Sequence, residues 1–168
     1  LDQAGKRVLG IDLDPQGNLG FCLGAGMSSP HTILDVMNGS VPVHKALVRC
    51  DYGDLLVSDI TLSNNGLDGI RTNREFILRD AINPVMDFFD YIIIDTPPAL
   101  NLLTVNAYSV SNFLIITMAS DILSLVGLAQ LKETIESVRG SFNPGLNVLG
   151  ILLTRFNPRT LLSRDVLE

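Results

Sequence analysis

The stretch that decides the fold is YIIIDTPP, at residues 91–98. Three isoleucines follow a tyrosine without interruption, and an apolar run this short is typical of a strand buried on both faces of a sheet. Asp95 comes next, so it would lie at the carboxyl end of that strand, where open α/β sheets bind their ligands. Taken alone, the stretch fits equally well a core strand that ends in a turn, with Asp95 capping the next helix.

Three further apolar segments alternate with helical patterns along the chain. They lie at residues 8–13, 113–118 and 148–154. The segment 124–138 has apolar residues at three- and four-residue steps, which predicts an amphipathic helix. A second helical pattern at 75–88 contains Pro84, which predicts a kink or a break. Strands that alternate with helices predict an α/β fold with a doubly wound, mainly parallel sheet and helices on both faces.

Shorter elements are predicted from local signals. Residues 19–29 are rich in Gly and Ser and are expected to form a loop, after which Ser29 would cap a short helix that ends at Asn38. Residues 55–58 predict a brief strand. Asn101 is expected to cap a helix that runs to about Val110.

Length and composition limit the classes of function. At 168 residues the chain fits a single domain, residues 1–168. Its net charge of −6 argues against a basic DNA-binding face on this segment. It has no uninterrupted run of eighteen apolar residues and no signal-peptide pattern at its start. Cys22 and Cys50 share no metal-ligand spacing, so we expect reduced thiols in a cytoplasmic protein.

Carboxylates follow two of the predicted strands. Asp12 and Asp14 end the segment that begins at Val8, as Asp95 ends the other. Because parallel strands place their carboxyl ends along one edge, we expect all three to face one crevice. Carboxylates there can hold Mg²⁺ through water and orient an attacking water. A Gly-rich phosphate loop with its Lys is missing from the sequence, so the residues alone predict half of a nucleotide site.

Three motifs in the sequence resemble the ParA/Soj family of deviant Walker-type ATPases. They are KRVLGIDLDPQGN at 6–18, YIIIDTPPAL followed by LLTVNA at 91–107, and LGILLTRFNPRT at 149–160. They occur in the family's order, and the resemblance covers essentially the whole chain. It implies a P-loop NTPase-like fold and ATP hydrolysis with Mg²⁺.

The resemblance also implies roles for individual residues. By position, Asp95 would support Mg²⁺ through water, and Asp12 would lie behind it on the metal side of the site. Asp14 would position or activate the attacking water and respond to the γ-phosphate. The loop that flanks the adenine would contain Asn157, Pro158 and Arg159.

The whole protein would then be a chromosome or plasmid partition ATPase. Family members dimerise around ATP, bind DNA without sequence preference and are stimulated by a ParB-type centromere-binding protein, in the cytoplasm at the nucleoid. The family's Gly-rich loop, first strand and C-terminal helices have no counterpart here, so we expect a fragment that lacks ATPase activity by itself. Two alternatives stay open: a non-enzymatic ParA-like binding or scaffold module, and a MinD-type cell-division regulator.

Overall fold

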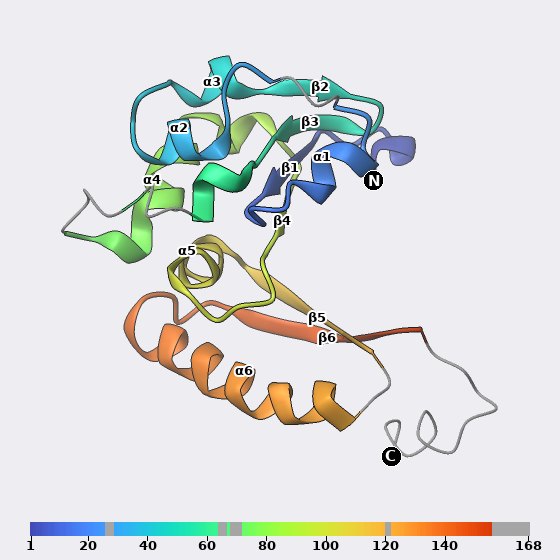
Figure 1. Ribbon diagram of the computed structural model, residues 1–168, viewed down its shortest axis with the longest axis vertical. Coiled ribbons are helices and arrows are strands. Elements are labelled where there is room, and N and C mark those ends of the chain that lie inside the picture. The colour runs from blue at the N-terminus through green and yellow to red at the C-terminus, as the bar shows by residue number, and fades with distance from the viewer. Residues whose placement is uncertain (26–28, 64–66, 68–71, 120–121, 156–168) are drawn as a thin grey trace. The chain divides into compact units, whose positions relative to one another are not determined.

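The computed structural model describes residues 1–25, 29–63, 67, 72–119 and 122–155. It consists of two compact units, Leu1–Ala107 and Tyr108–Glu168 (Figure 1), which are described separately below. The single domain expected from the chain length therefore stays a prediction. No helix in the described ranges is both long and apolar enough to cross a membrane.

The first unit is built on a four-stranded sheet. Its strands, in spatial order, are β2 (Val48–Cys50), β3 (Gly53–Leu56), β1 (Val8–Asp12) and β4 (Tyr91–Asp95). β1 runs parallel to both β3 and β4, whereas β2 is antiparallel to β3. The carboxyl ends of β1, β3 and β4 therefore lie along one edge of the sheet, which we call the carboxyl edge, and their amino ends form the amino edge.

The core of the first unit lies around β1 and β3. Leu9, Ile11, Leu55 and Leu56 are fully buried. Gly10 pairs with Leu55 in the ladder, and a Cβ at Gly10 would come within 2.8 Å of the Leu55 Cδ1 atom. A glycine at this position thus makes room for a core leucine, which explains why a small residue interrupts an apolar strand.

Short helices complete the first unit. They are α1 (Asn18–Cys22), α2 (Ile33–Met37), α3 (Val43–Ala46) and α4 (Ile77–Ile82), with 3-10 helices η1 (Asp2–Ala4), η2 (Ile60–Ser63), η3 (Arg74–Phe76) and η4 (Asn83–Phe88). α2 packs against α3 and α4. The predicted interruption near Pro84 is confirmed, because the α-helical geometry ends at Ile82 and a 3-10 helix follows with its proline in the first turn.

Two local predictions are wrong. Residues 19–29 are not all loop, because α1 begins at Asn18. The cap of α2 is Thr32 rather than Ser29: the Thr32 amide donates to the Asp35 carboxylate at 2.9 Å, and the Thr32 side chain completes the capping box. The strong cap thus lies three residues further along the chain than the Ser-Pro signal indicated.

The second unit contains two parallel strands joined by a long helix. The strands are β5 (Phe113–Ala119) and β6 (Asn147–Thr154), and α6 (Ile122–Ser141) connects them. The predicted amphipathic helix is confirmed in α6, where Ile135 and Val138 are buried. With α5 (Leu102–Val110), the elements alternate as predicted, and the α/β fold class with a mainly parallel sheet is confirmed.

Candidate functional site

The carboxyl edge of the first unit brings the predicted acidic residues together. In the ladder between β1 and β4, Asp12 is the partner of Asp95. The ladder continues for one step, because the Leu13 amide donates to the Asp95 carbonyl at 2.9 Å. Asp14 is close enough for its charge to perturb Asp95. The edge therefore holds a group of carboxylates, Asp12, Asp14 and Asp95, which we call the carboxylate cluster.

Asp12 is the buried member of the cluster. Its side chain has no exposed surface, and its two oxygens accept backbone N–H groups from Asp14 at 2.9 Å and from Leu19 at 3.1 Å. Burial raises the pKa of Asp12, these hydrogen bonds oppose the rise, and the charge of Asp95 adds to it. Because both oxygens already serve the backbone, Asp12 holds the turn that follows β1 and the start of α1.

Asp14 lies in that turn and is half-buried. One of its carboxylate oxygens accepts the Gln16 amide at 3.0 Å. The turn closes at Gly17, which has φ +66° and no room for a side chain, since a Cβ would lie 3.0 Å from the Ser58 carbonyl oxygen. Only glycine meets both demands without strain. The turn is thus packed against Ser58, in the segment that follows β3, and one oxygen of Asp14 is left for a ligand or a water.

Asp95 is the exposed member of the cluster. Partial burial raises its pKa, and the negative charge of Asp14 raises it further. In the described part of the chain, no Lys or Arg forms an ion pair with any carboxylate of the cluster. Like charges held together without a cation are unfavourable, and a bound cation would relieve that repulsion.

The carboxylates of the cluster are suitable ligands for Mg²⁺, but they could supply only some of the ligands that the ion needs. Carboxylate oxygens are the protein ligands that Mg²⁺ prefers, usually one or two of them together with waters and substrate phosphates. Among the described residues, no group of three or more His, Cys, Asp or Glu side chains is placed so that together they could hold a metal ion. The cluster would therefore supply only part of a coordination shell, as a nucleotide-dependent Mg²⁺ site requires.

The three residues predicted beside the adenine lie outside the described residues. The structure describes the chain that leads to them: β6 ends at Thr154, and Arg155 follows with φ +53°. Asn157, Pro158 and Arg159 therefore keep the roles that the resemblance gave them, as predictions.

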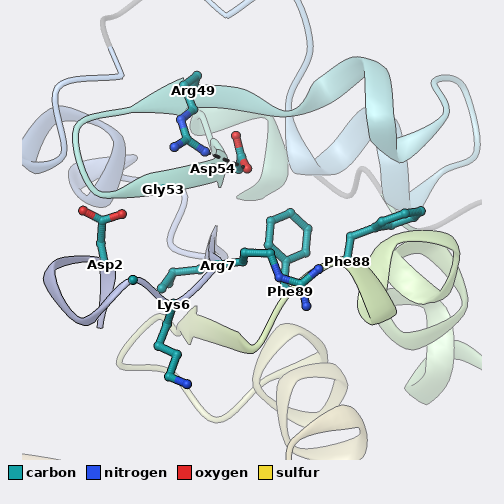
Figure 2. Close-up of a pocket in the computed structure, with 10 residues that line it drawn as sticks. Asp2, Lys6, Arg7, Arg49, Gly53, Asp54, Phe88 and Phe89 are labelled. Atoms are coloured by element: carbon teal, nitrogen blue, oxygen red, sulfur yellow. Dashed lines mark hydrogen bonds and ion pairs between the residues drawn. The ribbon is translucent and has the colours of Figure 1, made fainter.

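A separate cavity of about 410 Å³ opens at the amino edge of the sheet. Figure 2 shows Arg7, Phe88 and Phe89 on one side of it, across from Arg49 and Asp54. This cavity was not predicted from the sequence. The sequence feature that lies at this cavity is the pair Lys6-Arg7 just before β1. The partner of Arg7, Asp90, is 83 residues away, so the sequence does not show the pairing. The cavity and the carboxylate cluster lie at opposite ends of the same strands.

Two carboxylates at the amino edge, Asp90 and Asp54, form ion pairs with arginines, whereas within the described residues those of the carboxylate cluster form none. Arg7 donates to Asp90 through its backbone amide at 2.9 Å and through its guanidinium at 2.9 and 3.3 Å. The side-chain and backbone hydrogen bonds from Arg7 lower the pKa of Asp90 to about 2. Arg49 pairs with Asp54 at 3.2 Å. Asp90 and Asp54 are thus each paired with an arginine.

Comparison with known proteins shows a consistent set of relatives. The model of a family described as "AAA domain" matches residues 1–148. The Caulobacter vibrioides chromosome partitioning protein ParA is 40% identical over 172 residues, which cover 99% of this chain and 64% of that protein. The Treponema pallidum chromosome-partitioning ATPase Soj is 31% identical over 168 residues, covering 98% of this chain and 66% of that protein.

Solved structures also match over nearly the whole chain. A Mycobacterium smegmatis protein described as cobyrinic acid a,c-diamide synthase, with a bound ATP analog and magnesium, matches at a TM-score of 0.92 and 38% identity. The match covers 99% of this chain and 69% of that one. The chain thus spans about two thirds of the length of the relatives it matches. From the family model, the partition relatives and this fold, we conclude that the chain belongs to the ParA/Soj family of AAA-domain proteins.

Proposed function

We propose that the protein is a ParA/Soj-type ATPase that acts in chromosome or plasmid partitioning, with ATP and Mg²⁺ as its cofactors. The observation that carries the proposal is the in-register pairing of Asp12 with Asp95 at the carboxyl edge, with Asp14 beside them. Open α/β sheets bind nucleotides at this edge. A cluster of carboxylates without a basic partner among the described residues suits a cation-dependent phosphate chemistry.

Each carboxylate has a distinct part in the proposed mechanism. Bound Mg²⁺ supplies positive charge that offsets the charge developing on the phosphate oxygens. Asp95, exposed at the end of β4, would hold Mg²⁺ through water. Asp14 uses its free oxygen to orient the attacking water or to accept its proton. Asp12 takes no direct part, because it keeps the turn that carries Asp14 in place.

The remaining features of the whole protein follow from the family and are part of the proposal. Asn157, Pro158 and Arg159 flank the adenine. The protein dimerises with ATP, binds DNA non-specifically and responds to a ParB-type partner, in the cytoplasm at the nucleoid. With a net charge of −6, the chain described here is a poor DNA ligand, so DNA contacts would come mainly from other parts of the protein.

The test requires a chimera, because the chain spans 64% of its Caulobacter relative. In the chimera, the relative supplies the segments that the chain does not span, including the Gly-rich loop that the resemblance places before Leu1. We expect slow ATP hydrolysis, and we expect Asp14→Ala to lower turnover by about 10²- to 10⁴-fold, the usual contribution of a general base. ATP binding should persist, since Asp14 acts on the water.

A matched control is Asp87→Ala, which removes an exposed carboxylate on η4, away from the carboxyl edge. It should turn over ATP at the rate of the unmodified chimera. Equal turnover in the Asp14 and Asp87 variants would contradict the role given to Asp14. No ATP hydrolysis in the unmodified chimera would favour the non-enzymatic binding or scaffold module.

The chain by itself should not bind Mg·ATP measurably, because the cluster offers no phosphate-binding loop. Isothermal titration calorimetry measures this directly, and micromolar binding would contradict it.

The Mycobacterium smegmatis match gives a second candidate function, that of an ATP-dependent amide synthase. Assaying the chimera with ATP, cobyrinic acid and a source of ammonia distinguishes it, since a partition ATPase should form no amide product.

A further inference from the structure

One buried amide connects two segments that lie far apart in the sequence. Asn106, on α5, has no exposed surface. Its Oδ1 accepts the Leu78 amide at 2.9 Å, and its Nδ2 donates to the carbonyls of Arg74 at 2.8 Å and Leu102 at 2.9 Å. Both amide hydrogens and the carbonyl oxygen are therefore used.

The first consequence concerns the start of α4. Leu78 lies in the first turn of α4, where backbone N–H groups have no partner within the helix. The residue at the cap position is Phe76, which gives no side-chain hydrogen bond. Asn106 thus acts as the cap of α4 from 28 residues away. Through Arg74 it also holds η3, the segment that leads into that helix.

The second consequence concerns the loop that follows Asp95. The loop, residues 96–100, is fastened to the first turn of α5. The Thr104 hydroxyl donates to the Ala99 carbonyl at 2.6 Å, and the Asn101 amide donates to the same oxygen at 3.1 Å. Asn101 Oδ1 accepts the Leu103 and Thr104 amides at 3.0 and 3.3 Å, which confirms its predicted capping role.

These contacts form two sets of hydrogen bonds that are joined through the first turn of α5. One set runs from α4 and η3 through Asn106 into α5, and the other runs from the first turn of α5 through Thr104 into the loop beside Asp95. α4 and α5 are the helices that follow β3 and β4, so Asn106 links the segments that come after the two strands on either side of β1. Thr104 is also almost fully buried, at 2% exposed, so water does not compete for either side chain.

We infer that Asn106 is a positioning residue for Asp95: it fixes α5, which in turn holds the loop that sets the direction of the Asp95 carboxylate. The inference rests on the proposed function, because the proposed function is what assigns Asp95 to the binding of Mg²⁺. A purely structural role would lower the stability of the fold without changing how the protein uses its metal.

The test compares two asparagines with the same bonding pattern. Asn106→Asp keeps the shape and an acceptor but loses both donors. Asn143→Asp is the matched control, since Asn143 donates to the Tyr108 and Ser111 carbonyls at 2.8 and 2.7 Å and accepts the Gly145 amide at 3.2 Å. Tyr108 lies in the last turn of α5, so this control contacts the helix only at the end away from the loop after Asp95. Both variants should lower the melting temperature.

The deciding readout is the Mg²⁺ concentration that gives half-maximal ATP turnover by the chimera. We expect Asn106→Asp to raise it about tenfold and to lower kcat, in the range found when partners of metal-site residues are removed. The KM for ATP at saturating Mg²⁺ should change little. Asn143→Asp should leave all three values unchanged at a temperature where both variants are folded.

A second variant keeps the test decisive if Asn106→Asp does not fold. Thr104→Val keeps the side-chain shape and removes only the hydrogen bond to Ala99, and it should raise the Mg²⁺ requirement in the same direction by a smaller factor. If Asn106→Asp and Thr104→Val both fold and need no more Mg²⁺ than the Asn143→Asp control, the positioning role of Asn106 is overturned but the proposed function is not. An unmodified chimera without Mg²⁺-dependent turnover would overturn the proposed function together with it.

Discussion

The two edges of the sheet in the first unit treat the same kind of side chain in opposite ways. At the amino edge, Asp90 is held by Arg7, and its pKa falls to about 2. At the carboxyl edge, the pKa of Asp95 rises, because the residue is partly buried and faces another carboxylate, Asp14. The two aspartates stand at opposite ends of the same strand, five residues apart in the sequence.

The difference shows what each edge is for. A carboxylate paired with an arginine is already neutralised within the protein, and the ion pair stabilises the fold. A cluster of carboxylates that no cation in the described residues matches carries a cost in the folded state. Such a cost is typical of binding sites, where the missing positive charge comes with the ligand. We therefore infer that the carboxylates of the amino edge stabilise the fold, whereas those of the carboxyl edge bind a ligand.

The largest effect should come from Asp12, the one carboxylate of the cluster that the fold itself needs. Asp12→Ala leaves the partly buried amides of Asp14 and Leu19 without the Asp12 acceptor. At roughly 1–3 kcal/mol for each unsatisfied group, the variant should lose about 2–6 kcal/mol of unfolding free energy. Urea unfolding of the chain measures this. A loss below about 0.5 kcal/mol would contradict the view that Asp12 supports the turn.

A smaller effect is expected at the amino edge from Asp90→Asn. The folded pKa of about 2 lies below the ordinary value of 3.8, so ionised Asp90 stabilises the fold at neutral pH. That contribution is lost as the pH falls from about 4 to about 2. The variant should therefore melt below the wild type at pH 7, and the difference should shrink in acid. A difference that is constant with pH would contradict the ion-pair explanation.

The smallest effect, and one of opposite sign, is expected from Asp95→Asn. Because the folded pKa of Asp95 lies above 3.8, the folded state loses stability as the pH rises through that pKa. The neutral amide removes the repulsion with Asp14, so the variant should melt slightly above the wild type at pH 7 and match it in acid. Thermal melts from pH 3 to pH 8 measure this. A variant less stable than the wild type at pH 7 would contradict the unmatched state of the cluster.

The sequence predicted the features that depend on periodic patterns or on residues close together. Apolar runs marked β1, β4, β5 and β6, and their parallel arrangement explains why Asp12 and Asp95 meet. Pro84 marked the end of α4. The positions of these strands could be predicted because short apolar runs favour strands. The burial on both faces that such runs predict is found in β1 but not in the other three strands, where Ile93, Ile115 and Leu149 are exposed.

The features that the sequence did not predict depend on distant partners or on weak local signals. β2 has three residues with a charged one, Arg49, in the middle, so it has no apolar run. α1 begins without a side-chain cap, after Gly17. Asn106 looks like any polar residue in a helix until its partner Leu78, 28 residues away, is known. The pairing of Arg7 with Asp90 spans 83 residues, so the amino edge and its cavity left no local pattern.

The most direct test of the comparison is a carbon-detected NMR titration of the Asp90 and Asp95 carboxyl groups in one sample of the chain. Each residue serves as the control for the other, because both report on the same folded molecule at the same pH. We predict that Asp90 titrates near pH 2 and Asp95 above pH 3.8. A pKa for Asp95 at or below that of Asp90 would show that the carboxyl edge is already neutralised, and it would contradict the assignment of that edge to a cation-dependent site.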